Sequence, residues 1–172
     1  MSLREAILKE HSKAQGMKIA GWVGNNEKHF TLLMQLFLKD EYRVVQRSAW
    51  IVSMVADHHP KLLFPHLNVM VKRMEEPNLP VAVKRNVIRI LQTIPIPKKL
   101  QGAVMEMCFH FLADPKEAIA VRCFSMTVLA NLSKDHPEVK NELTTIVQSA
   151  LEQKPSAAIR ARARKVLKEI EK

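Results

Sequence analysis

Glycine, cysteine and aromatic residues are scarce in this sequence of 172 residues, which has four glycines, two cysteines, two tryptophans and one tyrosine. So few glycines are typical of a helical chain with short connections. The two cysteines, Cys108 and Cys123, can form no disulfide framework and lack the CxxC spacing of metal ligands. We therefore expect a reducing, cytoplasmic location and no bound metal.

Membrane spans and catalytic motifs are also missing. No apolar run approaches the roughly 18 to 20 residues that cross a bilayer. Charges such as Arg4, Lys9 and Lys13 interrupt the region in which a signal peptide would be apolar. The sequence contains no phosphate-binding glycine loop, no GxSxG motif and no HxE…PCxxC motif. We therefore expect neither a membrane protein nor an enzyme, and no small-molecule cofactor.

Positive charge, by contrast, is in excess. Lys and Arg number 27 against 17 Asp and Glu, which gives a net charge of +10 and a pI near 9.8. The apolar fraction of 47% is ordinary for a soluble globular protein. The length fits one domain, residues 1–172, with a continuous core. The excess of cations predicts an acidic partner, either a protein or a nucleic acid.

A repeat of 38 residues organises the apolar positions, since Val45, Val83, Val121 and Ile159 follow one another at this interval. Six further columns keep the interval, and the upstream columns begin at Leu32, Leu33 and Leu36. The seven columns hold 28 positions, of which only Ser53 is not apolar. Chance would fill only about half of these positions with apolar residues, so the repeat is real.

The spacing of apolar residues within each unit predicts two α-helices. The first helices are predicted at 27–39, 64–76, 99–113 and 138–152. The second helices are predicted at 41–57, 80–94, 116–133 and 156–171. All nine prolines lie at or beside these boundaries, where a missing backbone N–H does least harm.

Stacked helix pairs follow from these predictions, because one pair alone cannot bury both of its faces. We expect an all-α, right-handed superhelix with repeats at 25–61, 62–99, 100–137 and 138–172. Residues 1–24 are predicted to form one extra helix that caps the stack, and the second helices are expected to line the concave side. No strand pattern competes with this architecture.

The openings of the second helices resemble those of the HEAT-repeat family, in which an apolar residue precedes a basic one, after a Pro or Asp. The matching residues are Val83-Lys84, Val121-Arg122 and Ile159-Arg160, with Asn78-Leu79-Pro80 and Asp114-Pro115 upstream. The first unit departs from the pattern at Val45-Gln46. The resemblance covers residues 24–172 and implies an armadillo-like α-solenoid that serves as a binding platform or scaffold. It also implies that Lys84, Arg122 and Arg160 bond to neighbouring acids or carbonyls.

Acidic residues are absent from the bodies of the predicted second helices, residues 42–56, 81–94, 118–134 and 157–168. At 100° per residue, offsets +2, +6 and +9 from Val45 and its equivalents point away from the core. We call these positions the strip; it reads Arg47-Ile51-Met54, Arg85-Arg89-Gln92, Cys123-Thr127-Ala130 and Ala161-Lys165-Lys168. Arginine with apolar neighbours is typical of protein-binding patches.

The predicted partner-binding residues come from this strip and its flanks. They are Arg43, Arg47, Trp50, Ile51, Met54, Lys84, Arg85, Arg89, Arg122, Lys165 and Lys168. Trp50 either joins the binding surface or packs between repeats. We expect that reversing Arg47, Arg85 and Arg89 to Glu abolishes binding without changing the melting temperature.

Histidine and cysteine provide weaker hypotheses. His58, His59 and His66 bracket a predicted turn beside Asp57, but their spacing matches no metal motif, and loop histidines are usually solvated. Cys108 falls in a core column. Cys123 falls on the strip, where a reactive thiol is the alternative to an inert side chain.

Three functions remain open at this point. The first is a non-catalytic binding or scaffold protein whose basic concave groove holds an acidic protein or peptide. The second is sequence-independent binding of nucleic acid through phosphates. The architecture is also similar to HEAT-like alkylpurine DNA glycosylases, which need a carboxylate among aromatic side chains. Asp57 lies about 10 Å along the helix from Trp50, so the sequence lacks a matching catalytic pattern.

Overall fold

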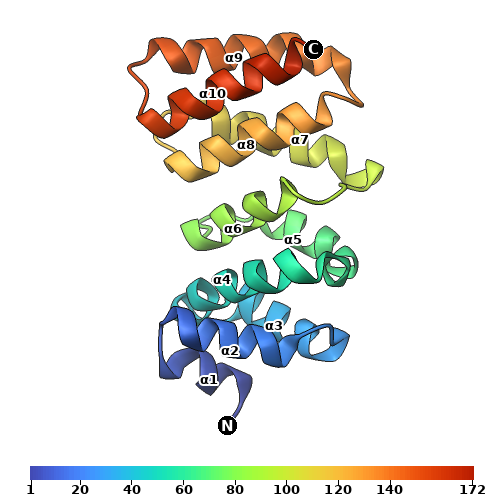
Figure 1. Cartoon of the computed structure of the whole chain (residues 1–172), viewed down its shortest axis with the longest axis vertical. Helices are drawn as coiled ribbons and strands as arrows, with labels where there is room; N and C mark the ends of the chain where they lie inside the picture. The colour runs from blue at the N-terminus through green and yellow to red at the C-terminus, as the bar shows by residue number, and fades with distance from the viewer. The chain divides into compact units, whose positions relative to one another are not determined.

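The computed structural model describes residues 1–172 and consists of helices without any strand (Figure 1). The first helices are α3 (Glu27–Lys39), α5 (Leu67–Arg73), α7 (Lys98–Ala113) and α9 (Lys140–Glu152). The second helices are α4 (Tyr42–His58), α6 (Val81–Leu91), α8 (Ile119–Leu132) and α10 (Ala157–Ile170). The predicted all-α class and the pairing of helices are confirmed. None of these helices combines the length and apolar character that a membrane span requires.

The N-terminal region departs from the prediction of a single capping helix. It forms two helices, α1 (Leu3–Lys9) and α2 (Lys13–Val23). The break has a local cause, because the backbone at Glu10 is extended and the Ser12 hydroxyl accepts a hydrogen bond from the backbone N–H of Gln15. Such an N-cap starts a new helix. The sequence therefore begins with an additional helix pair.

The first helix of the second repeat is also shorter than predicted. A 3-10 segment, η1 (Pro60–His66), precedes α5, and Pro65 lies inside it. Proline has no backbone N–H and cannot continue an α-helical ladder. A shorter 3-10 segment, η2 (Pro137–Val139), likewise precedes α9.

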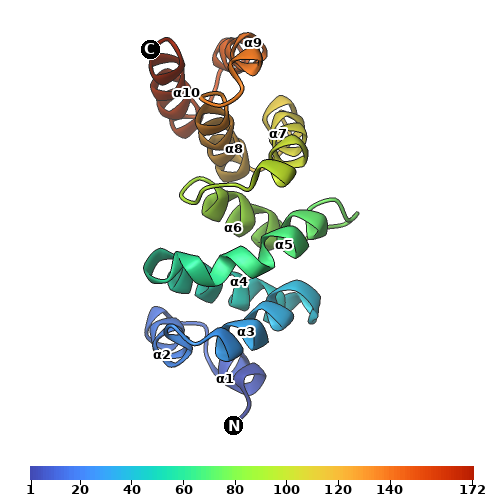
Figure 2. The ribbon, with the colours of Figure 1, turned by 90° about the vertical axis from the view of Figure 1, so that its right-hand side faces the viewer.

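Two compact units divide the chain, residues 1–90 and residues 91–172, and each is described by itself. In the first unit, α4 packs against α1, α2, α3 and η1. In the second unit, α8 packs against α7, α9 and α10. Figure 2 shows α8 and α10 on one side of the second unit and α7 and α9 on the other. The handedness of the superhelix and the concave position of the second helices stay predictions.

The core confirms most of the repeating columns. Val45, Val83, Val121 and Ile159 are at most 2% exposed. Leu32 is an exception at 48% exposure, because α3 directs other residues inward: Phe30, Leu33, Met34, Phe37 and Leu38.

The polar member of the columns, Ser53, has a structural role. It is buried on α4, and its hydroxyl donates a hydrogen bond to Oδ1 of Asn86 on α6 at 2.7 Å. Nδ2 of Asn86 in turn donates to the carbonyl of Ala82 at 2.8 Å. Ser53 therefore departs from the apolar pattern because it forms a buried polar pair with Asn86 of the neighbouring second helix.

Candidate functional site: the surface of the second helices

Two arginines among the predicted binding residues close the ends of other helices. Arg47 on α4 donates from Nη1 to the carbonyl oxygens of Ile7 and Leu8, at 3.1 and 2.8 Å, in the last turn of α1. Arg122 on α8 donates from Nε to the carbonyl of Leu112 at 3.2 Å, near the end of α7. Carbonyls in a last turn have no partner within their helix and attract cations. Both arginines therefore stabilise helix packing, as the resemblance implied for Arg122.

A third arginine of this kind was missed by the sequence analysis. Arg73, at the end of α5, donates from Nε to the carbonyl of Leu38 near the end of α3, at 3.0 Å, and it pairs with Glu76. The available signal was a basic residue in the last turn of a helix, but nothing in the spacing indicates which neighbouring helix it reaches.

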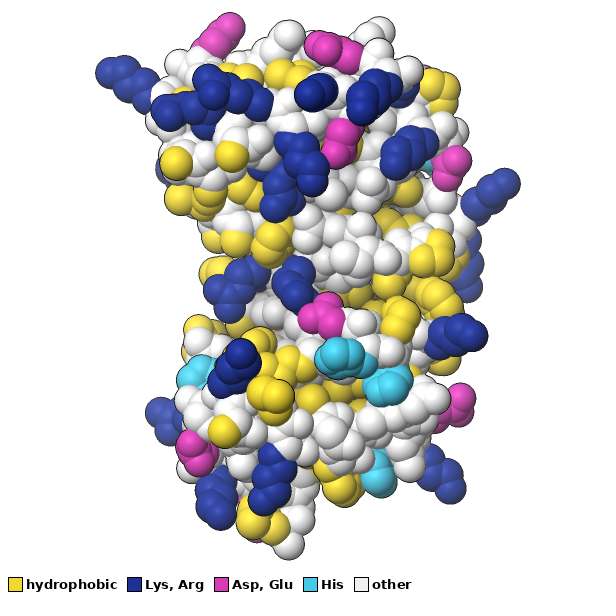
Figure 3. Space-filling view, viewed as in Figure 1, with side chains coloured by type: hydrophobic (Ala, Val, Ile, Leu, Met, Phe, Trp, Pro, Cys, Tyr) yellow, Lys and Arg dark blue, Asp and Glu magenta, His cyan; other side chains and the backbone are white.

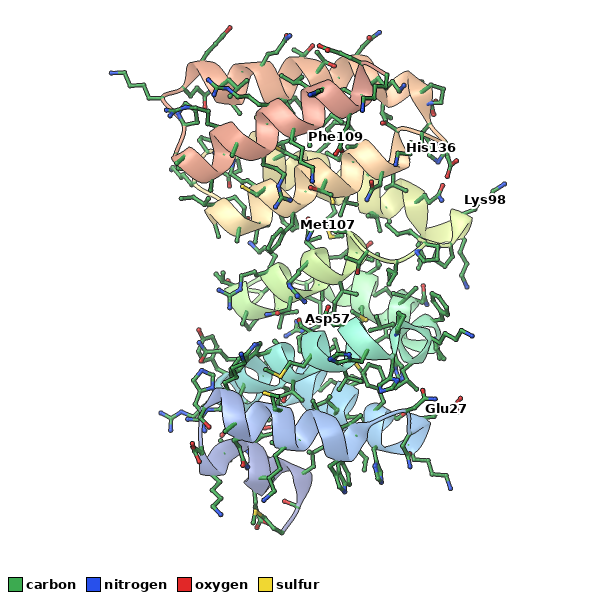
Figure 4. The ribbon with its side chains drawn as sticks, viewed as in Figure 1. Glu27, Asp57, Lys98, Met107, Phe109 and His136 are labelled. Carbon is green, nitrogen blue, oxygen red and sulfur yellow. The ribbon has the colours of Figure 1, made fainter.

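An ion pair links α4 to α6 on this surface. Nη2 of Arg89 lies 3.1 Å from Oδ2 of Asp57, and both side chains are about half exposed (Figure 4 labels Asp57). Lys84 is also half-buried, whereas Arg43 and Arg85 are exposed. Arg43 and Arg85 are therefore the predicted binding cations of the first unit that are most accessible to a partner.

The predicted apolar members of the site lie mainly under the N-terminal helix pair. Ile51 is only 3% exposed, so it belongs to the core, and the prediction that it is accessible is wrong. The Trp50 ring meets the His11 ring edge-on at 5.8 Å. A Cβ added at Gly16 of α2 would lie 3.3 Å from the terminal methyl of Met54 and 3.7 Å from Trp50. The packing alternative for Trp50 is the one that these contacts support.

The strip on α8 is likewise covered. Cys123 and Ala130 are 5% and 3% exposed, which contradicts the prediction that Cys123 lies at the surface. The reason is that α8 packs against three helices, α7, α9 and α10, and little of its circumference faces solvent. The prediction that offsets +2, +6 and +9 face outward assumed that each second helix is covered only by the first helix of its own repeat.

The surface of α10 differs, because α10 packs mainly against two helices, α8 and α9. Its exposed cations are Arg160, Arg164, Lys165 and Lys168. Figure 3 shows the dark-blue side chains gathered over this helix, at the top of the view. Lys165 lies 4.0 Å from Glu169, one turn later on the same helix, and Arg160 donates to the carbonyl of Pro155 at 3.3 Å. The predicted residues Lys165 and Lys168 are thus exposed members of a cationic helix face.

A groove lies between the N-terminal halves of α8 and α10. Its apolar lining includes Ile119, Phe124, Ala158 and Ala161, and its cationic lining is Arg162 and Lys165. Arg162 was not among the predicted binding residues, because it is at offset +3 from Ile159 and so falls outside the strip.

The chain matches the family model of the HEAT repeat domain over residues 3–170. The chain belongs to the HEAT-repeat family. No curated protein and no solved structure matches it. HEAT repeats generally mediate protein–protein interaction or scaffolding, and the family is typically non-enzymatic.

The histidines of this HEAT-repeat chain do not gather around one point. The rings of His58 and His59 are 6.5 Å apart, while His66 packs edge-on against Phe30 at 5.4 Å. Across residues 1–172, no three His, Cys, Asp or Glu side chains lie close enough together to hold a metal ion. Asp57, in the last turn of the helix that carries Trp50, pairs with Arg89 instead of facing an aromatic cluster.

Both thiols of the HEAT-repeat chain are buried. Burial raises the pKa of Cys108 to about 12. Burial also raises the pKa of Cys123, although the charges of Arg162 and Arg122 act in the opposite direction. Because the thiolate is the reactive form, both side chains behave as small apolar groups at neutral pH.

Proposed function

We propose that this HEAT-repeat chain is a non-catalytic binding or scaffold protein that holds an acidic protein or peptide on the cationic surface of its second helices. The observation that carries this proposal is the face of α10, where Arg160, Arg164, Lys165 and Lys168 are exposed and Glu169 is the one acidic residue of the helix. A surface of one sign costs stability through self-repulsion, so it normally serves a partner of the opposite sign.

The first unit carries exposed cations of its own. Arg43 and Arg85 are exposed on α4 and α6, whereas Arg47 and Arg122 are engaged with backbone carbonyls. We therefore assign direct partner contact to Arg43, Arg85, Lys165 and Lys168 of the residues predicted from the sequence. The hydrogen-bonded arginines support these contacts by fixing the helices.

Charge reversal on α10 tests the proposal. We expect the double variant Arg164→Glu/Lys168→Glu to lose binding to a fluorescein-labelled glutamate-rich peptide, measured by anisotropy, with an unchanged circular dichroism spectrum. Both side chains are exposed and neither forms a hydrogen bond or ion pair in the structure, so the fold should tolerate the change. The matched control is Lys98→Glu/Lys99→Glu at the start of α7, where Lys98 projects from the helix (Figure 4).

Nucleic acid is the second candidate, since the same exposed arginines and lysines also suit phosphate. A labelled DNA duplex and a single strand serve as probes in the same assay. Binding through several phosphates should weaken by orders of magnitude between roughly 50 and 200 mM salt, whereas a protein contact with apolar anchors should weaken much less. If the wild-type chain binds the nucleic acids and not the acidic peptide, the proposed function is wrong.

A further inference from the structure

The groove between α8 and α10 has the composition of a docking site for a side chain. It has a volume of about 690 Å³ and is open to solvent. Ile119 at its entrance is 51% exposed, Ala158 and Ala161 are exposed, and Phe124 is half-buried. An accessible apolar surface of this kind, bordered by charged residues, marks a contact with a partner.

Arg162 lies in this groove without any carboxylate partner. Its Nη1 donates to Oγ1 of Thr127 at 2.6 Å, to Oε1 of Gln92 at 2.9 Å and to the carbonyl of Cys123 at 3.3 Å. All three acceptors are neutral, and the guanidinium carbon lies 5.9 Å from the centre of the Phe124 ring. These contacts hold the side chain in one orientation and leave its charge uncompensated.

The free edge of this guanidinium suits a carboxylate. Nε and Nη2 of Arg162 have no hydrogen-bond acceptor in the structure, whereas Nη1 has three. A half-buried charge is costly unless it is paired, and a guanidinium binds a carboxylate through two parallel hydrogen bonds. Lys165, which also lines the groove, adds a second positive charge. None of the groove-lining residues is acidic.

We infer that the groove binds an acidic segment of a partner protein in which an apolar residue adjoins an Asp or Glu. The apolar side chain fills the space beside Ile119, Ala158 and Ala161, and the adjoining carboxylate pairs with Arg162. This inference rests on the proposed function, because it names the place and the sequence chemistry of the acidic partner. Charge complementarity selects this occupant: the lining carries only positive charges and the whole chain has a net charge of +10.

Selection from random peptides displayed on phage, with the purified chain as bait, tests the inference. We expect enriched peptides to be acidic and to carry Leu, Ile, Met or Phe next to Asp or Glu. A fluorescent copy of one enriched peptide should shift the amide resonances of Ile119, Ala158 and Arg162 in a titration of the labelled protein.

Two variants separate the groove from the outer face of α10. Arg162→Lys keeps the charge and loses the paired donors, so it should weaken the enriched peptide about tenfold. Ala161→Trp fills the groove from an exposed position and should abolish binding while the chain stays folded by circular dichroism. Lys98→Glu/Lys99→Glu should leave the affinity unchanged.

The other outcomes have distinct meanings. Acidic peptides that need no apolar residue, lose affinity in Arg164→Glu/Lys168→Glu and bind the Ala161→Trp variant normally would overturn the groove and leave the proposed function standing. If no acidic peptide is enriched and the glutamate-rich probe also fails to bind, both proposals are wrong.

Discussion

The guanidinium of Arg47 donates a hydrogen bond to the backbone carbonyl of Leu8 over 2.8 Å, and so the middle of α4 closes the C-terminal end of α1. A second bond from the same nitrogen reaches Ile7 at 3.1 Å. Because α1 has only seven residues, it gains little from its own hydrogen bonds and depends on this contact. Arg47 therefore belongs to the framework of the protein.

Removal of this contact should destabilise the chain. We expect Arg47→Ala to lower the free energy of unfolding by about 1–3 kcal/mol, the cost of leaving backbone carbonyls without partners. Urea denaturation measures the loss, and hydrogen exchange should be accelerated in α1. Arg43→Ala, an exposed cation on the same helix, should change neither quantity. Equal effects of the two variants would contradict the capping role.

This relationship also corrects the expectation for the triple charge reversal. Arg47→Glu places a carboxylate against the carbonyls of α1, and Arg89→Glu places one against Asp57. A loss of binding in that variant would report unfolding as much as a lost contact. Arg164 and Lys168 are the better positions, because both are exposed and have no partner.

The buried pair of Ser53 and Asn86 should behave as a coupled unit. Ser53→Ala leaves Oδ1 of Asn86 without its donor in the core, which should cost about 1–3 kcal/mol. The double variant Ser53→Ala/Asn86→Leu removes both polar groups and should recover part of the loss. A double-mutant cycle by chemical denaturation gives the coupling energy. Simple additivity of the two changes would show that the pair has no special role.

Two residues at turns between paired helices adopt a left-handed backbone, Lys154 with φ of 50° and Asn78 with φ of 57°. This conformation strains most side chains, is tolerated by Asn and costs Gly nothing. Lys154→Gly should therefore raise the free energy of unfolding by roughly 0.5–1 kcal/mol, after allowance for the flexibility of glycine in the unfolded chain. Asn78→Gly is the matched comparison and should have a smaller effect. Thermal denaturation of both variants distinguishes them.

Burial lowers the pKa of His66 below its ordinary value of 6.5, because the half-buried ring packs on Phe30. The unfolded chain then binds a proton more readily than the folded chain. The stability associated with the neutral ring is complete above pH 6.5 and declines as the pH falls below that value. We expect His66→Phe to reduce the loss of stability between neutral and mildly acidic pH, measured as the shift of melting temperature. His58→Gln, which changes an exposed ring, should retain the wild-type slope.

The sequence was sufficient for the helix pairs because apolar spacing and prolines act locally. Val83 and Val121 are buried as their columns require, and α3 spans the predicted residues. The break before Ser12 was missed because a short helix shows too few turns to establish a period. The prediction that Leu32 is buried was wrong, because its column lies off the face of α3 that packs inward.

The candidate site was harder to predict, since exposure depends on neighbours that are distant in the sequence. Ile51 and Cys123 occupy the strip, yet each is on a helix surrounded by several others. Lys168 occupies the same offset as Ala130 and is exposed, because α10 has fewer neighbouring helices. The contacts of Arg162 with Gln92 and Thr127 join residues that no periodic rule connects.

Arg47 and Arg122 donate hydrogen bonds to backbone carbonyls and yet keep their positive charge, because a carbonyl carries no net charge. Both arginines therefore still contribute to the long-range field that an approaching acidic molecule experiences. The speed of encounter should depend on these inner cations as well as on those that finally touch the partner. The lifetime of the complex should depend mainly on direct contacts. The arginines held by carbonyls should therefore influence the rate of association, and the cations that touch the partner should also determine the rate of dissociation.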